Sequence, residues 1–100
     1  EYTNFYTAMA YPGSQLYEDM VEQGADLPES WLSYSQLGKD TLSLSNESLS
    51  SSEILRFRDK AFEEYHGSPR YLRMIEEKFG ADTVEHIKGM LEHKLVRRFA

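Results

Sequence analysis

The chain has 100 residues, a formal net charge of −6 at pH 7, 40% hydrophobic residues and no cysteine. This length allows one domain at most, and the acidic balance disfavours nucleic acid and anionic membrane surfaces as partners. The lack of cysteine excludes disulfides, thiolate zinc sites and cysteine-bound clusters within the chain. It also fits a reducing compartment, so we expect a cytoplasmic protein. No apolar run approaches the roughly 20 residues of a membrane span.

The charge is uneven along the chain. Residues 1–50 carry eight acidic residues against one base, Lys39, whereas residues 51–100 carry nine acidic and ten basic residues. The chain begins with Glu1 and not with Met. We therefore interpret it as a piece of a longer polypeptide.

Residues 1–10 are rich in Tyr, Thr and Phe, which favour the pleated surface of a β-strand. Neither face of this segment beyond Glu1 is charged, which is typical of a strand covered on both sides in a parallel sheet or barrel. No other convincing strand follows, and one strand cannot satisfy its backbone hydrogen bonds alone. We predict an N-terminal strand whose partners lie elsewhere, and whose unpaired edges allow self-association.

This predicted strand leads into a tight turn made of Tyr11, Pro12, Gly13 and Ser14. Pro restricts φ and Gly permits positive φ, while Ser14 is a favourable N-cap for a helix over about residues 15–23. Gly24 is the expected end of that helix. Such a turn exposes backbone N–H groups, and α/β proteins bind ligands at the carboxyl ends of their strands. From the residues alone, a ligand site and a plain strand-to-helix connection are equally good interpretations.

Residues 25–50 predict an irregular connection rich in Ser and Leu. Within it, the apolar side chains of residues 31–37 predict a short helical turn that anchors a surface excursion. Three further helices are predicted over about residues 51–65, 69–79 and 82–97. Their signals are a capping box, an N-cap Ser followed by Pro, closing glycines and cations at the last carboxyl end. These signals come from Ser50, Glu53, Ser68, Pro69, Gly67, Gly80, Lys94, Arg97 and Arg98. The predicted fold is mainly α, of α+β type, with one N-terminal strand followed by about four helices.

No set of residues predicts catalysis or a metal site. His86, Met90 and His93 share a helix face, but two His seven residues apart cannot bind one ion without a further element, and a solvated face is the favoured interpretation. The acidic pairs at residues 63–64 and 76–77 have Arg or Lys nearby. They predict surface ion pairs in preference to acid–base chemistry.

The stretch NFYTAMAYPGSQLYEDMVEQG, residues 4–24, resembles the closing segment of the radical S-adenosylmethionine (radical SAM) barrel. It is most similar to the cobalamin-binding branch, whose strand is often followed by Tyr-Pro-Gly-Thr and then Leu-Tyr. Here Leu16 and Tyr17 follow the turn, and Ser14 replaces the more common Thr while keeping the hydroxyl. Trp31, a Ser-Leu stretch and the segment SSEILRFRDKAFEEYHGSPRYL extend the resemblance over most of the chain.

The resemblance implies a parent enzyme that uses a [4Fe–4S] cluster, SAM and cobalamin for radical chemistry. The family's three cluster-binding cysteines are missing here, so we expect this chain alone to hold no cofactor and to be non-catalytic. Residues 1–24 would be the last strand, turn and helix of the barrel, residues 25–50 a connection, and residues 51–100 a C-terminal helical extension. The turn at Tyr11–Ser14 would be a lip of the barrel mouth near SAM or substrate, and the rest of the polypeptide would be the partner. The alternative prediction is an independent small helical domain that binds a partner protein and can dimerise.

Overall fold

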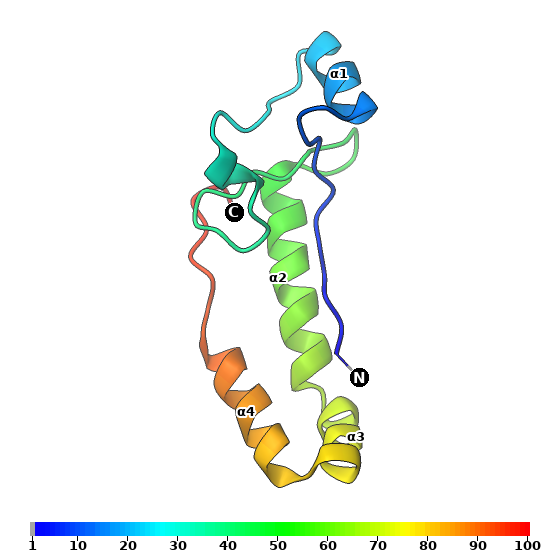
Figure 1. Cartoon of the computed structure of the whole chain (residues 1–100), viewed down its shortest axis with the longest axis vertical. Coiled ribbons are helices and arrows are strands. Elements are labelled where there is room, and N and C mark those ends of the chain that lie inside the picture. The colour runs from blue at the N-terminus through cyan, green and yellow to red at the C-terminus, as the bar shows by residue number, and fades with distance from the viewer. Residues whose placement is uncertain (1) are drawn as a thin grey trace. The chain divides into compact units, whose positions relative to one another are not determined.

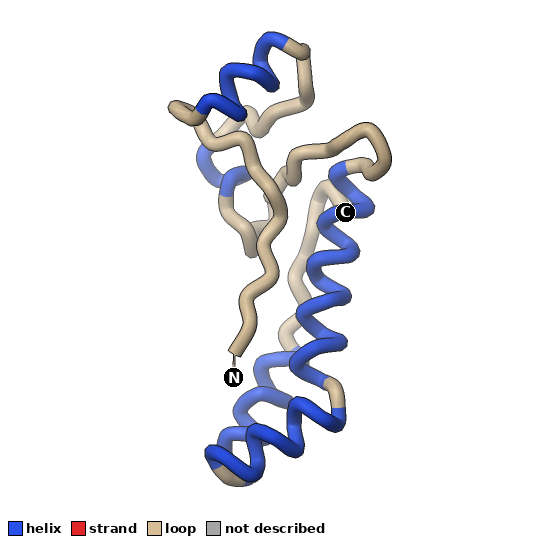
Figure 2. Tube along the Cα trace, turned by 90° about the vertical axis from the view of Figure 1, so that its right-hand side faces the viewer, coloured by secondary structure: helices blue, strands red, loops and turns tan. Residues whose placement is uncertain are grey.

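The computed structural model describes residues 2–100, and these residues are helical or irregular (Figure 1). The elements are α1 (Gln15–Glu22), a 3₁₀ turn η1 (Trp31–Tyr34), α2 (Ser51–Gly67), α3 (Pro69–Phe79) and α4 (Ala81–Glu92). None of the described residues forms a β-strand, as Figure 2 shows. The predicted α+β fold with an N-terminal strand is therefore wrong, because the described part of the chain is all-helical.

The segment predicted as a strand runs as an extended, irregular trace over its described residues, 2–10 (Figure 2). Glu1 lies outside the described residues. Burial alternates along residues 2–9, as on a pleated backbone: the odd positions are buried or half-buried, and the even positions are exposed. Tyr6 is 67% exposed, so the described residues leave one face of the segment uncovered. A strand needs a neighbouring strand to exchange backbone hydrogen bonds, and the described chain supplies none.

The described residues divide into two compact units, which we describe separately. The first unit combines the described part of residues 1–5 with Asp59–Lys94, and the second combines Tyr6–Arg58 with Leu95–Ala100. Helix α2 therefore contributes its first half to the second unit and its last part to the first unit.

The core of the first unit lies between α3 and α4, which follow each other closely at the lower end of Figure 1. Tyr71 and Ile75 are buried on α3, and Val84 and Ile87 are buried on α4. Spacings of four and three residues place each pair on one helix face. Burying a side chain of this size contributes about 1.5–3 kcal/mol, so these four residues account for much of the stability of the helix pair.

The second unit has a small and partly polar interior. Leu55 of α2 is fully buried, and so are Thr41 and Ser43 from the preceding loop. The Thr41 hydroxyl donates to the Gly38 carbonyl at 2.8 Å and also bonds the Ser35 carbonyl. Loop hydrogen bonds thus hold this region. The short helical turn predicted within residues 31–37 is present as η1, but Trp31, Leu32 and Leu37 are exposed and do not form the predicted apolar anchor.

Helix starts follow the sequence signals closely. The Ser14 hydroxyl accepts the Tyr17 N–H at 3.1 Å, and the Ser68 hydroxyl accepts the Tyr71 N–H at 3.2 Å. At α2, the Ser50 hydroxyl accepts the Glu53 N–H at 3.2 Å while a Glu53 carboxylate oxygen accepts the Ser50 N–H at 2.9 Å. The predicted N-caps and the predicted capping box are confirmed.

The last helix ends earlier than predicted, at Glu92. The predicted extension to residue 97 is wrong, because the basic residues that follow have other partners. Lys94 pairs with Glu63 at 3.0 Å in the first unit. In the second unit, Arg97 donates to two backbone carbonyls and the Arg98 N–H donates to the Lys39 carbonyl at 2.8 Å. Several hydrogen bonds of a charged donor outweigh the 0.3–1 kcal/mol that a cation gains from a helix dipole.

Candidate functional site

The turn at Tyr11–Ser14, which the sequence offered as a candidate ligand site, has the expected backbone conformation. The Ser14 N–H donates to the Tyr11 carbonyl at 3.1 Å, and Gly13 has φ of 92°. Pro12 followed by a Gly with positive φ defines a type II turn. The Ser14 hydroxyl donates to the Tyr11 carbonyl at 2.6 Å and also caps α1. The hydroxyl is thus engaged within the chain, and contact of this turn with SAM or substrate stays a prediction.

Aromatic rings extend from this turn to the 3₁₀ turn. The Tyr11 and Tyr34 ring centroids are 5.6 Å apart, and those of Trp31 and Tyr34 are 6.1 Å apart. Burial raises the pKa of the Tyr34 hydroxyl, and the neighbouring Tyr17 raises it further. Tyr34 is therefore the half-buried centre of a row whose outer members, Tyr11 and Trp31, are exposed.

The side chain of Gln36 takes the place of a neighbouring strand beside Thr7. Gln36 Oε1 accepts the Thr7 N–H at 2.9 Å, and Gln36 Nε2 donates to the Thr7 carbonyl at 3.0 Å. Both backbone groups of one residue are bonded in this way between paired antiparallel strands. The Gln36 carbonyl in turn accepts from Arg97 Nη1 at 2.9 Å. This amide connects the extended segment to the C-terminal residues within the second unit.

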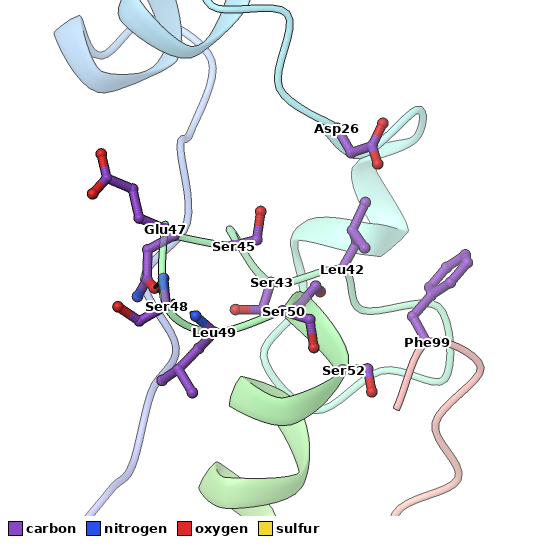
Figure 3. A pocket seen from close by; sticks show the side chains of 12 residues that line it. Asp26, Leu42, Ser43, Ser45, Glu47, Ser48, Leu49, Ser50, Ser52 and Phe99 are labelled. Carbon is purple, nitrogen blue, oxygen red and sulfur yellow. Dashed lines mark hydrogen bonds between the residues drawn. The ribbon is translucent and has the colours of Figure 1, made fainter.

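A hollow of about 710 Å³ lies next to the start of α2 in the second unit (Figure 3). Its polar lining consists mainly of serine hydroxyls with two carboxylates, those of Asp26 and Glu47. A serine becomes a nucleophile when an adjacent base takes its proton, and no His or Lys lines the hollow. The carboxylates also oppose an anionic ligand at the helix start. The hollow offers hydrogen-bonding groups without a constellation for catalysis.

The Glu53 carboxylate in the α2 capping box has a shifted pKa. Hydrogen bonds from the backbone N–H and the hydroxyl of Ser50 lower the pKa of Glu53 below its ordinary value of 4.5. The folded chain thus prefers the ionised form. The ionised Glu53 carboxylate therefore stabilises the fold at pH values above its ordinary pKa, and this stabilisation is lost as the pH falls through the lowered pKa of the folded chain.

We expect Glu53→Gln to lower the thermal unfolding midpoint at neutral pH, because the charge-assisted part of the capping box is removed. The difference from wild type should shrink as the pH falls from about 5 to about 3, where Glu53 itself becomes protonated. Circular dichroism melts at several pH values measure this effect. Glu64→Gln is the control, because Glu64 lies in the same helix away from the cap and pairs with Lys60. A Glu53→Gln deficit that stays constant down to pH 3 would contradict the assignment.

A buried histidine that the sequence patterns did not single out lies in the first unit. His66 of α2 is 0% exposed, and its ring centroid lies 4.3 to 5.2 Å from the rings of four aromatic residues, Phe62, Tyr2, Tyr65 and Tyr71. Nδ1 lies 2.9 Å from the Phe62 carbonyl, which can only accept, so Nδ1 carries the hydrogen. Nε2 is buried and has no hydrogen-bond partner among the described residues. The sequence signal that could have revealed it is its position four residues after Phe62, because that spacing puts both side chains on one face of a helix.

The two histidines that were considered as metal ligands, His86 and His93, do not form a site. His86 is exposed on α4, and His93 is the C-cap residue that follows this helix. Within residues 2–100, no cluster of three or more His, Asp or Glu side chains could hold a metal ion. The same residues include no helix with the length and apolar character needed to cross a membrane. The chain matches no protein-family model, no curated protein and no solved structure with which it was compared.

Proposed function

We propose that this chain is a non-catalytic segment that completes or covers the barrel of a cytoplasmic radical SAM enzyme. Its partner is the rest of the same polypeptide, which would hold the [4Fe–4S] cluster, SAM and cobalamin. The likeness of residues 4–24 to the end of that barrel motivates the proposal. The turn at Tyr11–Ser14 would then lie at the barrel mouth, near SAM or substrate.

One observation supports this proposal most directly. Tyr6 of the extended segment is 67% exposed, and its backbone groups form no hydrogen bond with another described residue. The backbone groups of an extended segment pair with a neighbouring strand in a sheet, and an exposed segment is accessible to such a strand. The proposal supplies this neighbouring strand from polypeptide outside this chain. The same groups could alternatively be bonded by a second copy.

The test compares the 100-residue chain with the polypeptide encoded together with the sequence upstream of Glu1. We expect three cysteines spaced C-x₃-C-x₂-C upstream, and iron–sulfur absorbance in the longer polypeptide. Hydrogen exchange at the Tyr6 amide should be at least tenfold slower there than in the 100-residue chain. Lack of the cysteines, or equal exchange in both polypeptides, would overturn the proposal.

The second candidate is an independent helical domain that binds another protein. It is favoured by the exposed apolar side chains of the second unit, among them Trp31 and Leu32. This candidate predicts that the 100-residue chain sediments as a monomer and unfolds in one cooperative transition. Slow exchange at Tyr6 in that monomer would favour it over the first proposal.

A further inference from the structure

The last residues of the chain fold back onto the loop that contains Gln36. Leu95–Ala100 belong to the second unit together with Tyr6–Arg58, whereas α4, which ends shortly before them, belongs to the first unit. We call Leu95–Ala100 the C-terminal strap. The strap contains no helix, so its contacts with the rest of the second unit determine where it lies.

Arginines attach the C-terminal strap to the loop around Gln36. Arg97 Nη1 donates to the Gln36 carbonyl at 2.9 Å and to the Gly38 carbonyl at 3.2 Å. The Arg98 backbone N–H donates to the Lys39 carbonyl at 2.8 Å. Hydrogen bonds from a charged guanidinium are about twice as strong as bonds between neutral groups. Among the described residues, the Gln36 carbonyl accepts a hydrogen bond from Arg97 alone.

The side chain of Gln36 passes this restraint on to the extended segment. Gln36 Oε1 accepts the Thr7 N–H at 2.9 Å, and Gln36 Nε2 donates to the Thr7 carbonyl at 3.0 Å. A glutamine side chain loses rotamer entropy when it is fixed in one conformation. The two bonds to Thr7 are therefore favoured when the backbone of Gln36 is already held in place, and Arg97 is the residue of the strap that holds it.

We propose that the C-terminal strap is an autoinhibitory contact that keeps the backbone of Thr7 closed to strand pairing. While the strap is bound, Gln36 occupies both backbone groups of Thr7. When the strap is released, Gln36 loses its restraint, and the N–H and C=O of Thr7 become accessible to a neighbouring strand. The strap suits release, because its ion pair between Arg98 and Asp40 is 3.5 Å long with side chains 66% and 38% exposed, and such exposed pairs contribute little. This inference uses only contacts within the second unit and does not rest on the radical SAM proposal.

Amide hydrogen exchange at Thr7, measured by NMR on the whole chain, tests this coupling. Gln36→Ala removes the acceptor of the Thr7 N–H and should speed exchange there about tenfold, as for the loss of one hydrogen bond. Arg97→Ala keeps Gln36 and should still speed exchange at Thr7 about fivefold. Val96→Ala is the matched control in the strap, because Val96 is 69% exposed, and it should change the exchange rate less than about twofold.

A double variant separates coupling from two independent losses. In the Gln36→Ala background, Arg97→Ala should change exchange at Thr7 less than about twofold, because the side chain that transmits the effect is gone. Exchange at the Ile75 amide in the first unit shows whether a variant unfolds as a whole. If Arg97→Ala does so, Arg97→Lys takes its place, since it keeps the charge and loses the fork of donors. Unchanged exchange at Thr7 in either single variant, or an equal effect of Arg97→Ala with and without Gln36, would overturn the proposal.

Discussion

Replacing Ile75 with alanine is expected to lower the free energy of unfolding by about 2–5 kcal/mol. Ile75 is 2% exposed and packs with Tyr71, Val84 and Ile87 between α3 and α4. Its truncation removes apolar burial and leaves a cavity that two short helices cannot fully close. Single domains are stable by about 5–15 kcal/mol, so this one change removes a large share of the total.

Urea unfolding followed by circular dichroism measures this loss. Phe79→Ala is the control on the same helix, because Phe79 is 54% exposed and lies outside the buried cluster. Its loss should stay below about 1 kcal/mol, as for most exposed positions. Similar losses for Ile75→Ala and Phe79→Ala would show that the buried cluster is not the source of stability of the helix pair.

His66→Ala is expected to destabilise the chain by about 3–5 kcal/mol, as for a buried aromatic residue. His66→Phe, in contrast, should be neutral or stabilising by up to about 1 kcal/mol. Phenylalanine keeps the contacts with the four surrounding rings and removes Nε2, whose burial without a partner costs about 1–3 kcal/mol. The Nδ1 bond to Phe62 is lost at the same time, which limits the gain.

Thermal melts of both variants test the packing role of His66. His86→Phe on the exposed face of α4 is the control and should change stability by less than about 0.5 kcal/mol. If His66→Phe loses as much stability as His66→Ala, the imidazole nitrogens stabilise the fold through bonds that packing does not provide.

The helix starts could be predicted because their signals are local. Ser14, Ser50 and Ser68 each lie within three residues of the N–H group that they cap. The N-terminal strand was wrong because its residue types suit a strand, whereas pairing depends on a neighbour that local sequence does not reveal. The end of α4 was wrong for a similar reason, since Arg97 bonds carbonyls about 60 residues away.

In the candidate site, too, the local features could be predicted from the sequence and the long-range contacts could not. The Pro12-Gly13 turn and the Ser14 cap follow from residue types and spacing. The bonding of Thr7 by Gln36 joins positions 29 residues apart, and no periodicity indicates it. The aromatic row beside the turn also depends on where the 3₁₀ turn folds back, so its membership could not be predicted from spacing.

The Gln36 side chain has a consequence for aggregation. Exposed backbone edges of extended segments are where identical chains stack into fibrils, and proteins protect such edges with charges, prolines or bulges. Gln36 protects residues 2–10 at Thr7 by filling one register position with an amide of its own. A strand from another copy could not continue past Thr7 on this edge without displacing Gln36. One glutamine side chain thus opposes the addition of strands from other copies at a segment whose composition favours such pairing.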